Sequence, residues 1–307
     1  MKIADKFRIA SVVVTYNRKE LVVENIISTL NQSLKVDKII VVNNCSTDGT
    51  EEYLNNRFVD ETKIEVVSLD QNYGGAGGFY YGLKHAIDLG YDYVFLMDDD
   101  GRPYNDQCFE NLFLSIIESD YNKPIMINSM VIQNESKLTF GLGKIEFIEE
   151  AYKKAENGIV TGIINPFNGT LISRKLVETI GYPNKDFFIK GDEVDYYARA
   201  IKATAVVHTA VNSLYYHPAP PNMKQKKFFG KSMYVYAEAS WKEYYNVRNA
   251  TYRLKTLVGK KAAFKYFLKS LFRITVIKCD KLKIYRAMMA GYNDGMTEKL
   301  GRLDRDL

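Results

Sequence analysis

Features that define several large classes of protein are missing from this chain of 307 residues. Its three cysteines, Cys45, Cys108 and Cys279, are far apart and form no Cys-x-x-Cys pair. This argues against a disulfide framework or a zinc site and fits a reducing cytoplasm. No stretch approaches the ~20 apolar residues that span a bilayer, and Met1–Lys6 carries no apolar signal segment. We therefore expect a cytoplasmic protein without a membrane-spanning helix.

Common phosphate-binding and nucleic-acid-binding signatures are also absent. There is no GxxxxGKS/T P-loop, and Tyr80 stands where Gly75 and Gly77 would need a third glycine to complete the dinucleotide fingerprint. The net charge is +5, but no nucleic-acid reader motif accompanies it, so we predict no nucleic-acid partner. With 46% hydrophobic and 26% charged residues, the composition is that of an ordinary globular protein.

The first third of the chain alternates strand and helix patterns. Apolar runs predict strands at residues 8–15, 38–42, 63–69 and 92–97. Helical spacing and cap residues predict helices at 19–31, about 46–55 and 77–89. Strands separated by helices of this length form right-handed βαβ crossovers. We therefore predict an α/β fold with a mainly parallel, Rossmann-like sheet flanked by helices.

The rest of the chain has less regular secondary-structure patterns, and its composition changes near Lys224. Further strands are predicted at 125–133, 158–164 and 205–211, and helices at 174–180 and 192–202. From about Lys224 the sequence is basic, aromatic and mostly helical. We expect residues 1–223 to form the α/β domain and residues 224–307 a separate helical C-terminal region.

The most informative motif is a run of three carboxylates, Asp98-Asp99-Asp100, at the end of the apolar strand Tyr93–Met97. Three adjacent like charges repel and cannot be buried without a compensating cation. Ligands bind at the C-terminal edge of an α/β sheet, where a divalent metal would compensate the charge and also bind diphosphate oxygens. Because Gly101 and Pro103 follow, a solvated acidic turn is the structural alternative.

Polar residues end the neighbouring strands in the same layer. Thr15-Tyr16-Asn17-Arg18 follows the first strand, and Asn43–Gly49 follows the second. Such groups are placed to meet a ligand, although simple helix capping is the alternative. Asn72 precedes the glycine-rich segment Gly74–Gly78 at the start of a helix, where backbone N–H groups favour an anion such as diphosphate. A flexible turn is the alternative there.

A second acidic cluster, Asp192-Glu193-Val194-Asp195, follows the aromatic residues Phe187 and Phe188. A carboxylate held beside an acceptor hydroxyl acts as a general base. The same acids could instead merely complement a helix dipole in the first turn. His217 follows 24 positions after Glu193 and, with carboxylates already present, would complete a mixed oxygen and nitrogen metal site. His85 and His208 are less suited, because they fall within a helix and a strand.

These segments, in this order, resemble the family 2 glycosyltransferases with the GT-A fold, especially bacterial galactofuranosyltransferases and related rhamnosyltransferases of cell-surface polysaccharide synthesis. The likeness runs from about Ile9 to His217 and weakly on to Tyr244–Asn249. It implies an inverting, metal-dependent hexosyltransferase whose GT-A catalytic domain covers residues 1–223. The sugar would pass from a nucleotide-sugar donor to a glycan acceptor.

The resemblance also implies roles for individual residues. The residues that line the nucleotide pocket would be Thr15, Asn17, Arg18 and Asn44. The residues that face the diphosphate or the donor sugar would be Asn72, Gly74, Gly75 and Asp99. Asp98, Asp100 and His217 would hold Mn²⁺ or Mg²⁺. Glu193 falls where the family has its catalytic base, and Asp192 is its neighbour.

Departures from the family pattern leave the donor open. Many relatives carry Asp where this chain has Asn44 followed by Cys45, so the nucleotide is uncertain between UDP and dTDP. Relatives often have Trp where this chain has Gly191, which alters the acceptor site, and usually Asp where it has Glu193. UDP-galactofuranose is the preferred donor and dTDP-rhamnose the alternative.

Two other classes of protein are the alternative interpretations. A sugar-phosphate nucleotidyltransferase would need a glycine-rich loop directly after the first strand, which Thr15–Arg18 does not provide. A catalytically inactive nucleotide-binding module would have little use for an intact acidic triplet, Glu193 and His217.

The C-terminal region suggests where the protein acts. Lys255–Arg286 contains ten Lys or Arg residues and one acid, and Lys260–Arg273 mixes basic and apolar residues at helical spacing. Such a segment can lie on an anionic membrane surface, and Lys224–Phe229 adds a second basic-aromatic patch. We expect a peripheral position at the inner face of the cell membrane and an acceptor linked to a lipid diphosphate. A solvated helical face or a homo-oligomer contact is the alternative.

Overall fold

The computed structural model describes residues 6–116, 122–219, 224–228, 231–235, 239–275 and 280–304, with backbone alone for 224–235. The chain divides into two compact units, which we treat separately. The first unit comprises Met1–Tyr73, Gly78–Pro183 and Tyr196–Ala219. The second comprises Gly74–Gly77, Asn184–Asp195 and Pro220–Leu307. The predicted division into residues 1–223 and 224–307 stays a prediction.

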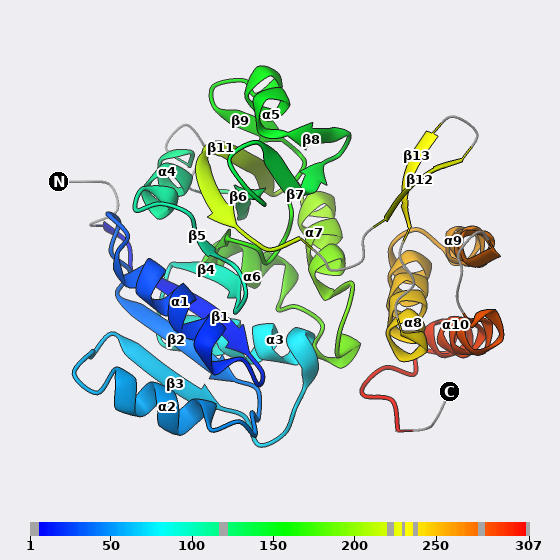
Figure 1. Cartoon of the computed structure of the whole chain (residues 1–307), viewed down its shortest axis with the longest axis horizontal. Coiled ribbons are helices and arrows are strands. Elements are labelled where there is room, and N and C mark those ends of the chain that lie inside the picture. Colours follow the sequence, from blue (N-terminus) through cyan, green and yellow to red (C-terminus); the bar gives the residue numbers. More distant parts are fainter. Residues whose placement is uncertain are drawn as a thin grey trace. The chain divides into compact units, whose positions relative to one another are not determined.

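The first unit is built on one large mixed sheet, shown with its helices in Figure 1. Its strands run in the spatial order β3-β2-β1-β4-β10-β6-β11-β5, and β7, β8 and β9 pair beside this path. The strands are β1 (Ile9–Thr15), β2 (Lys38–Asn43), β3 (Ile64–Ser68), β4 (Tyr93–Asp98), β5 (Arg102–Pro103), β6 (Ile125–Ile132), β7 (Lys137–Leu142), β8 (Ile145–Phe147), β9 (Ile159–Thr161), β10 (Thr170–Ser173) and β11 (Val206–Tyr216). The first four are parallel to one another, as predicted. β10 runs antiparallel to β4 and β6, whereas β11 is parallel to β6.

Helices cover both faces of this sheet. They are α1 (Lys19–Leu30), α2 (Thr50–Arg57), α3 (Gly74–Asp88), α4 (Cys108–Leu114), α5 (Ile148–Lys154), α6 (Arg174–Ile180) and α7 (Asp192–Lys202). Helices α1, α2 and α4 pack on one face, and α3, α6 and α7 on the other. Strands covered on both sides read as continuous apolar runs, which is why β1 and β4 were visible in the sequence.

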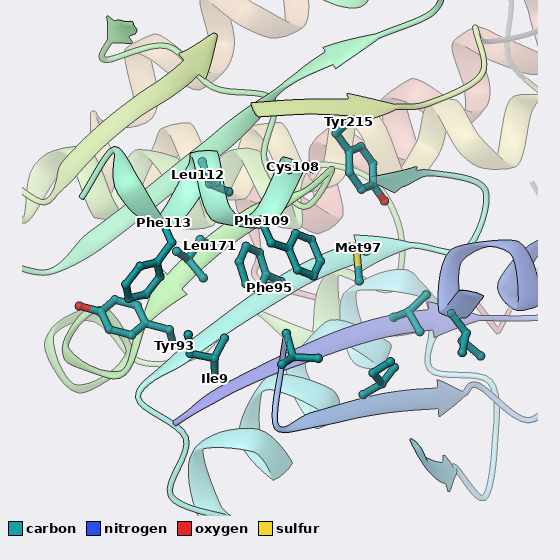
Figure 2. Close-up of a cluster of buried hydrophobic side chains, with 14 of the residues drawn as sticks. Ile9, Tyr93, Phe95, Met97, Cys108, Phe109, Leu112, Phe113, Leu171 and Tyr215 are labelled. Carbon is teal, nitrogen blue, oxygen red and sulfur yellow. The ribbon is translucent and has the colours of Figure 1, made fainter. Parts of the chain in front are cut away.

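Aromatic side chains fill the first of these two cores (Figure 2). The rings of Phe95 and Phe109 stack with their centroids 3.8 Å apart. Tyr93 meets Phe113 edge-on at 5.4 Å. These contacts pack α4 against β4.

Several predicted boundaries differ from the structure. Helix α3 begins at Gly74 rather than Gly77, so the glycine-rich segment is its first turn and not a loop before it. The cap of α2 is Gly49, and Asp48 instead accepts a hydrogen bond from the Thr50 N–H. β11 extends to Tyr216, five residues beyond the predicted end. Helices α4 and α5, each of seven residues, were not predicted.

The second unit is a helical bundle. Its helices are α8 (Ser240–Leu257), α9 (Lys260–Thr275) and α10 (Lys281–Met296), and it also contains the strands β12 (Lys224–Phe228) and β13 (Lys231–Val235). This hairpin was not expected in a region predicted to be mostly helical. Gly291 and Gly295 let α10 approach the backbone of α8, since an added Cβ would come within 2.5 Å of carbonyl oxygens there. Arg273 of α9 donates to both carboxylate oxygens of buried Glu243 on α8, at 2.9 and 2.8 Å.

No helix in the described ranges is both long enough and apolar enough to cross a membrane.

Candidate active site

The parallel strands of the first unit bring their polar ends to one edge of the sheet. Thr15 of β1 lies in register with Asn43 of β2, and Val14 of β1 with Asp98 of β4. The residues that follow these strands, from Tyr16, Asn44 and Asp99 onward, therefore share one edge. Sequence reasoning placed these groups together correctly because parallel strands order their C-terminal ends in this way.

Asp99 is the buried centre of this edge. Its Oδ2 accepts a hydrogen bond from Thr15 Oγ1 at 2.8 Å, and its Oδ1 lies 2.9 Å from Arg18 Nη1. Burial raises the pKa of Asp99 above its ordinary value, although the charge of Arg18 and the Thr15 hydrogen bond oppose the shift. The acid is thus fully engaged within the protein and orients both Thr15 and Arg18.

Asp100 lies between two basic side chains. Arg18 Nη1 lies 3.0 Å from its Oδ2, and His217 Nε2 lies 3.1 Å from its Oδ1. Burial alone would raise the pKa of Asp100, but the hydrogen bond and charge of His217 and the charge of Arg18 outweigh it and lower the pKa. For His217, burial would lower the pKa, and Asp100 reverses that shift so that the pKa rises.

His217 is fixed by its surroundings as well as by Asp100. Its Nδ1 is 2.7 Å from the carbonyl of Pro218, and its own carbonyl accepts from Thr139 Oγ1 at 2.8 Å. The Phe140 ring packs against the imidazole with centroids 4.9 Å apart. A histidine 117 positions beyond Asp100 in the sequence thus meets the acidic triplet, as predicted from residue type alone.

Two buried residues that support this edge were missed by sequence reasoning. Asn25 Nδ2 donates to the carbonyls of Asp98 and Gly101, at 3.3 and 2.7 Å, and so fixes the turn that carries the triplet. Tyr215 packs against Gly101, and its fully buried hydroxyl has no hydrogen-bond partner among the described residues (Figure 2). A polar residue on the apolar face of α1, next to Val22 and Ile26, was the available signal for Asn25.

The predicted nucleotide-pocket residues form a linked set of loops. Asn17 Oδ1 accepts from the Thr47 N–H at 2.7 Å, joining the loop after β1 to the loop after β2. Asn44 Nδ2 donates to Asn72 Oδ1 at 3.2 Å, and the Tyr73 N–H donates back to Asn44 Oδ1 at 3.0 Å. Asn17 and Cys45 both adopt positive φ, of 54° and 60°. Such backbone is sparsely populated outside glycine and clusters at binding sites.

The chemistry of this edge suits a divalent cation, but a complete metal cage is not assembled. Across the described ranges, no group of three or more His, Cys, Asp or Glu side chains is arranged to hold a metal ion. The adjacent Asp100 and His217 nevertheless form an oxygen and nitrogen donor pair. Mg²⁺ is commonly bound by one or two carboxylates together with substrate phosphates and water. The residues present therefore fit an ion whose remaining ligands come from a diphosphate.

The other acidic cluster belongs to the second unit. Asp192 and Glu193 begin α7, with Asp192 buried and Glu193 partly exposed. Asp195, one position beyond Val194, is buried as well. Asp192 is thus a buried acid beside the partly exposed Glu193, and the roles predicted for these two carboxylates stay predictions. Both acids do lie in the first helical turn, so the dipole interpretation applies at the same time.

Gly74 and Gly75, also in the second unit, open α3. Gly74 has φ +70°, and an added Cβ would lie 2.0 Å from the Phe188 carbonyl oxygen, so only glycine fits. Nothing lies within 4 Å of the corresponding position at Gly75, which leaves its backbone open. Gly78, by contrast, is required for packing, because a Cβ there would meet Val14 at 2.3 Å.

Comparisons with known proteins agree with this geometry. The family model described as "Glycosyl transferase family 2" matches residues 11–181, more than half of the chain. The protein is similar to the galactofuranosyltransferase GlfT1 of Mycolicibacterium smegmatis, with 27% identity over 253 residues, covering 80% of this chain and 82% of the relative.

Solved structures show the same fold. The chain aligns over 95% of its length with residues 1–349 of Staphylococcus aureus TarS in complex with UDP-GlcNAc, covering 82% of that chain, with a TM-score of 0.58 and 14% identity. It aligns equally far with the mannosyltransferase PcManGT of Pyrobaculum calidifontis, solved with GDP-Man and Mn²⁺, covering 88% of that chain, with a TM-score of 0.55 and 13% identity. The sheet and its neighbours define a GT-A glycosyltransferase. The chain belongs to glycosyltransferase family 2.

Proposed function

We propose that the protein transfers galactofuranose from UDP-galactofuranose to a hydroxyl of a glycan acceptor, with inversion at the anomeric carbon. The observation that carries this proposal is the acidic edge of the first unit, where Asp99 and Asp100 meet Arg18, Thr15 and His217. Similarity to a galactofuranosyltransferase over most of both chains supports the choice of sugar. Similarity to the poly-β-1,6-N-acetyl-D-glucosamine synthase of Staphylococcus epidermidis, 28% identical over 182 residues, supports a role in polysaccharide synthesis.

In this proposal the nucleotide occupies the linked loops after β1 and β2. Asn17 and Asn44 offer amide groups to the base and ribose, while Thr15 and Arg18 are already oriented by Asp99. Asn72 faces the donor beside Asn44. Gly74 and Gly75 present the first N–H groups of α3, which favour the diphosphate charge.

Asp98, Asp100 and His217 would hold Mn²⁺ or Mg²⁺. The structure of PcManGT with GDP-Man and Mn²⁺ supports such an ion in this fold. When bound, the ion would act as a Lewis acid and template for the diphosphate leaving group. Arg18 supplies a fixed positive charge that does not depend on the ion, since its guanidinium stays protonated at all relevant pH values.

Glu193 is the proposed general base, and Asp192 is its supporting neighbour. The acceptor O–H bond breaks as its proton moves to the Glu193 carboxylate. The freed oxygen forms a bond to the anomeric carbon while the bond from that carbon to the UDP oxygen breaks, through an oxocarbenium-like transition state. UDP leaves with the bonding electron pair. A general base of this kind contributes ~10²–10⁴-fold to the rate.

The donor has one specific alternative, dTDP-rhamnose, because Asn44 stands where many relatives have Asp. Calorimetric titration with UDP and with dTDP, each with and without Mn²⁺, separates the two. Mn²⁺-dependent binding of UDP alone supports the UDP-sugar, and a preference for dTDP moves the assignment to rhamnosyl transfer. Binding of neither nucleotide would contradict the proposed site. Retained nucleotide binding without turnover of either donor would leave an inactive binding module.

We further propose that α9 rests on an anionic membrane surface where a lipid-diphosphate-linked acceptor is presented. Phe264, Leu268 and Phe272 are 50%, 49% and 56% exposed at intervals of four residues. Lys261, Lys265 and Lys269 are exposed beside them. This mixture of basic and apolar groups on one helical face suits the lipid headgroup region. The predicted second patch, Lys224–Phe229, lies outside the side chains that the structure describes.

Vesicle sedimentation tests the membrane contact. Replacing Lys261, Lys265 and Lys269 with serine should reduce binding to phosphatidylglycerol vesicles, while phosphatidylcholine vesicles bind neither form. The matched control replaces three exposed lysines of the first unit, Lys153, Lys154 and Lys175, with serine. Equal loss in both triple variants would indicate general charge attraction, and a dimer that dissociates in the first variant would indicate an oligomer contact.

A further inference from the structure

The segment that precedes the acids of α7 is held by two side chains of α8. Arg248 Nη2 donates to the carbonyls of Asp186 and Phe187, at 3.1 and 2.8 Å. Asn249 Nδ2 lies 3.0 Å from the carbonyl of Phe187 and 2.9 and 2.7 Å from those of Ile189 and Lys190. Both side chains are 1% exposed. We name these two residues the clamp, and residues 186–191 the clamped segment.

The clamp has one defined orientation. Arg248 Nε donates to Asn249 Oδ1 at 2.8 Å, which fixes the amide so that its NH₂ group faces the clamped segment. Arg248 also donates through Nη1 to the carbonyl of Gly301 and packs against the Tyr245 ring, 4.7 Å from its centroid. A guanidinium buried in this way is costly unless its donors are used. Three of its five N–H groups are directed at backbone carbonyls, and a fourth at the Asn249 side chain.

The clamped segment needs this external support. Phe188, Lys190 and Gly191 adopt positive φ values of 64°, 68° and 85°, and the first two are not glycine. Backbone of this kind persists only where the surroundings determine it. The carbonyls of residues 186, 187, 189 and 190 are used by the clamp rather than by a helix or sheet ladder. Directly after the segment come Asp192 and Glu193.

The carbonyl of Phe188, which the clamp does not use, serves a different element. Phe188 O accepts a hydrogen bond from the Ala76 N–H at 3.0 Å and lies where any side chain at Gly74 would clash. The first turn of α3 is therefore attached to the same short segment. A single stretch of backbone positions both the predicted base and the predicted diphosphate-binding glycines.

We propose that Arg248 and Asn249 are positioning residues of the transfer reaction, which set the backbone from which Glu193 acts and, through Phe188, the first turn of α3. This inference rests on the proposed function, in which Glu193 is the base. Neither residue of the clamp contacts a reacting atom. Their effect on catalysis passes through the clamped segment, because a small displacement of a catalytic group lowers its efficiency sharply.

The first test needs no substrate. Hydrogen exchange of peptides covering residues 186–195 is compared in the wild type, in Asn249→Ala and in Arg248→Lys. The control is Arg273→Lys, which disturbs the ion pair between α9 and α8 but leaves the clamp intact. We expect faster exchange in both clamp variants and unchanged exchange in the control. Unchanged exchange in both clamp variants would overturn the proposal.

The second test asks whether the clamp acts through the base. UDP release from UDP-galactofuranose, with water as the acceptor, is measured for Asn249→Ala, Glu193→Gln and the double variant. We expect Asn249→Ala to lower kcat by about 10–100-fold with KM for the donor unchanged. In the double variant, Asn249→Ala should cost nothing beyond Glu193→Gln, because residues that act as a unit are not additive. Additive losses would overturn the proposal.

The two tests separate this inference from the proposed function. If the wild type releases no UDP, or Glu193→Gln keeps full activity, the proposed function has failed while hydrogen exchange still reports on the clamp. If Asn249→Ala does not fold, Asn249→Ser, which keeps one hydroxyl donor, replaces it in both tests. Should neither variant fold, Asn249 serves the fold alone and the positioning role is refuted.

Discussion

The two acidic clusters of this protein are held by different means. In the first unit, Asp99 and Asp100 meet basic side chains directly, since Arg18 contacts both and His217 contacts Asp100. In the second unit, the guanidinium of Arg248 and the amide of Asn249 hold the backbone carbonyls of the segment that leads to Asp192. One cluster is fixed through its charges and the other through its backbone.

The difference matches the chemistry proposed for each cluster. An acid that binds a diphosphate-linked cation must keep its charge near other charges, and direct ionic partners orient it before the ligand arrives. A general base must be free to take a proton, and an ion pair on its carboxylate would oppose that. Support through the backbone leaves the Glu193 carboxylate available. In this proposal, Arg18 supports the departure of the diphosphate, and Arg248 supports the backbone that precedes the base.

The largest effect should follow from Asp100→Ala. It removes a carboxylate next to His217 and leaves Arg18 with one partner fewer, so Mn²⁺-dependent UDP binding should disappear. The rate should fall by more than ~10⁴-fold, the upper limit for a general base, because the leaving group loses its charge stabilisation. Calorimetry and UDP release measure the two effects. The control is Asp106→Ala, which changes an exposed acid of the same region. Equal losses of UDP binding and rate in both variants would contradict a specific role for Asp100.

The next largest effect should follow from Glu193→Gln. The amide keeps the shape of the side chain but cannot accept the proton, so kcat should fall by ~10²–10⁴-fold while Mn²⁺-dependent UDP binding persists. Single-turnover kinetics with a parallel calorimetric titration distinguish the two. Glu178→Gln, an exposed acid on α6, should behave as the wild type. If Glu193→Gln loses nucleotide binding as Asp100→Ala does, the division of roles between the two clusters is wrong.

The sequence predicted the edge of the sheet better than it predicted the clamp. Thr15, Asn44 and the triplet follow apolar runs whose parallel pairing orders their ends, so continuous apolar runs separated by helical patterns were enough. The prediction for His217 rested on the carboxylates that were already proposed as metal ligands. The parallel pairing of the first four strands and the start of α7 at Asp192 were also available from these patterns.

What the sequence could not predict depends on burial and long-range contact. Arg248 and Asn249 lie about 60 positions beyond the carbonyls that they hold, and a polar pair within a helix gives no sign of its target. Asn25 and Tyr215 were missed for the same reason. The start of α3 was placed three residues late, because glycines are poor helix formers whose role here is to avoid Phe188 and Val14.

A smaller effect should appear in the pH dependence of stability, which we expect in the first unit. All three histidines of the chain, His85, His208 and His217, lie in the first unit. Burial lowers the pKa of His208 to about 4, so the folded state stays neutral where the unfolded chain, with a pKa near 6.5, binds a proton. Stability contributed by His208 is therefore complete above pH ~6.5 and is lost as the pH falls toward 4, by up to about 3 kcal/mol.

Hydrogen exchange at several pH values checks this expectation. Amides of the first unit should lose protection between pH 6.5 and 4, and His208→Gln should lose less than the wild type, since glutamine has no proton to gain. His217 acts in the opposite sense, because Asp100 raises its pKa and favours the protonated form in the folded state. If His208→Gln leaves the pH dependence of the first unit unchanged, buried His208 is not its source.

The smallest effect should come from Tyr215→Phe, which tests whether charge alone holds the acidic edge of the first unit. Burial, with Asp98 and Asp100 nearby, raises the pKa of Tyr215 well above its ordinary value, so its hydroxyl is neutral and lacks a partner in the described part of the chain. Removing an unsatisfied buried hydroxyl should leave stability unchanged or raise it by up to about 1 kcal/mol. Tyr196→Phe is the matched control, because that hydroxyl donates to the Gly181 carbonyl at 3.1 Å and its loss should cost about 1 kcal/mol. Urea unfolding gives both values, and calorimetry should show Mn²⁺-dependent UDP binding unchanged in Tyr215→Phe. Weaker binding would mean that a neutral hydroxyl shares with Arg18 and His217 the work of ordering this edge.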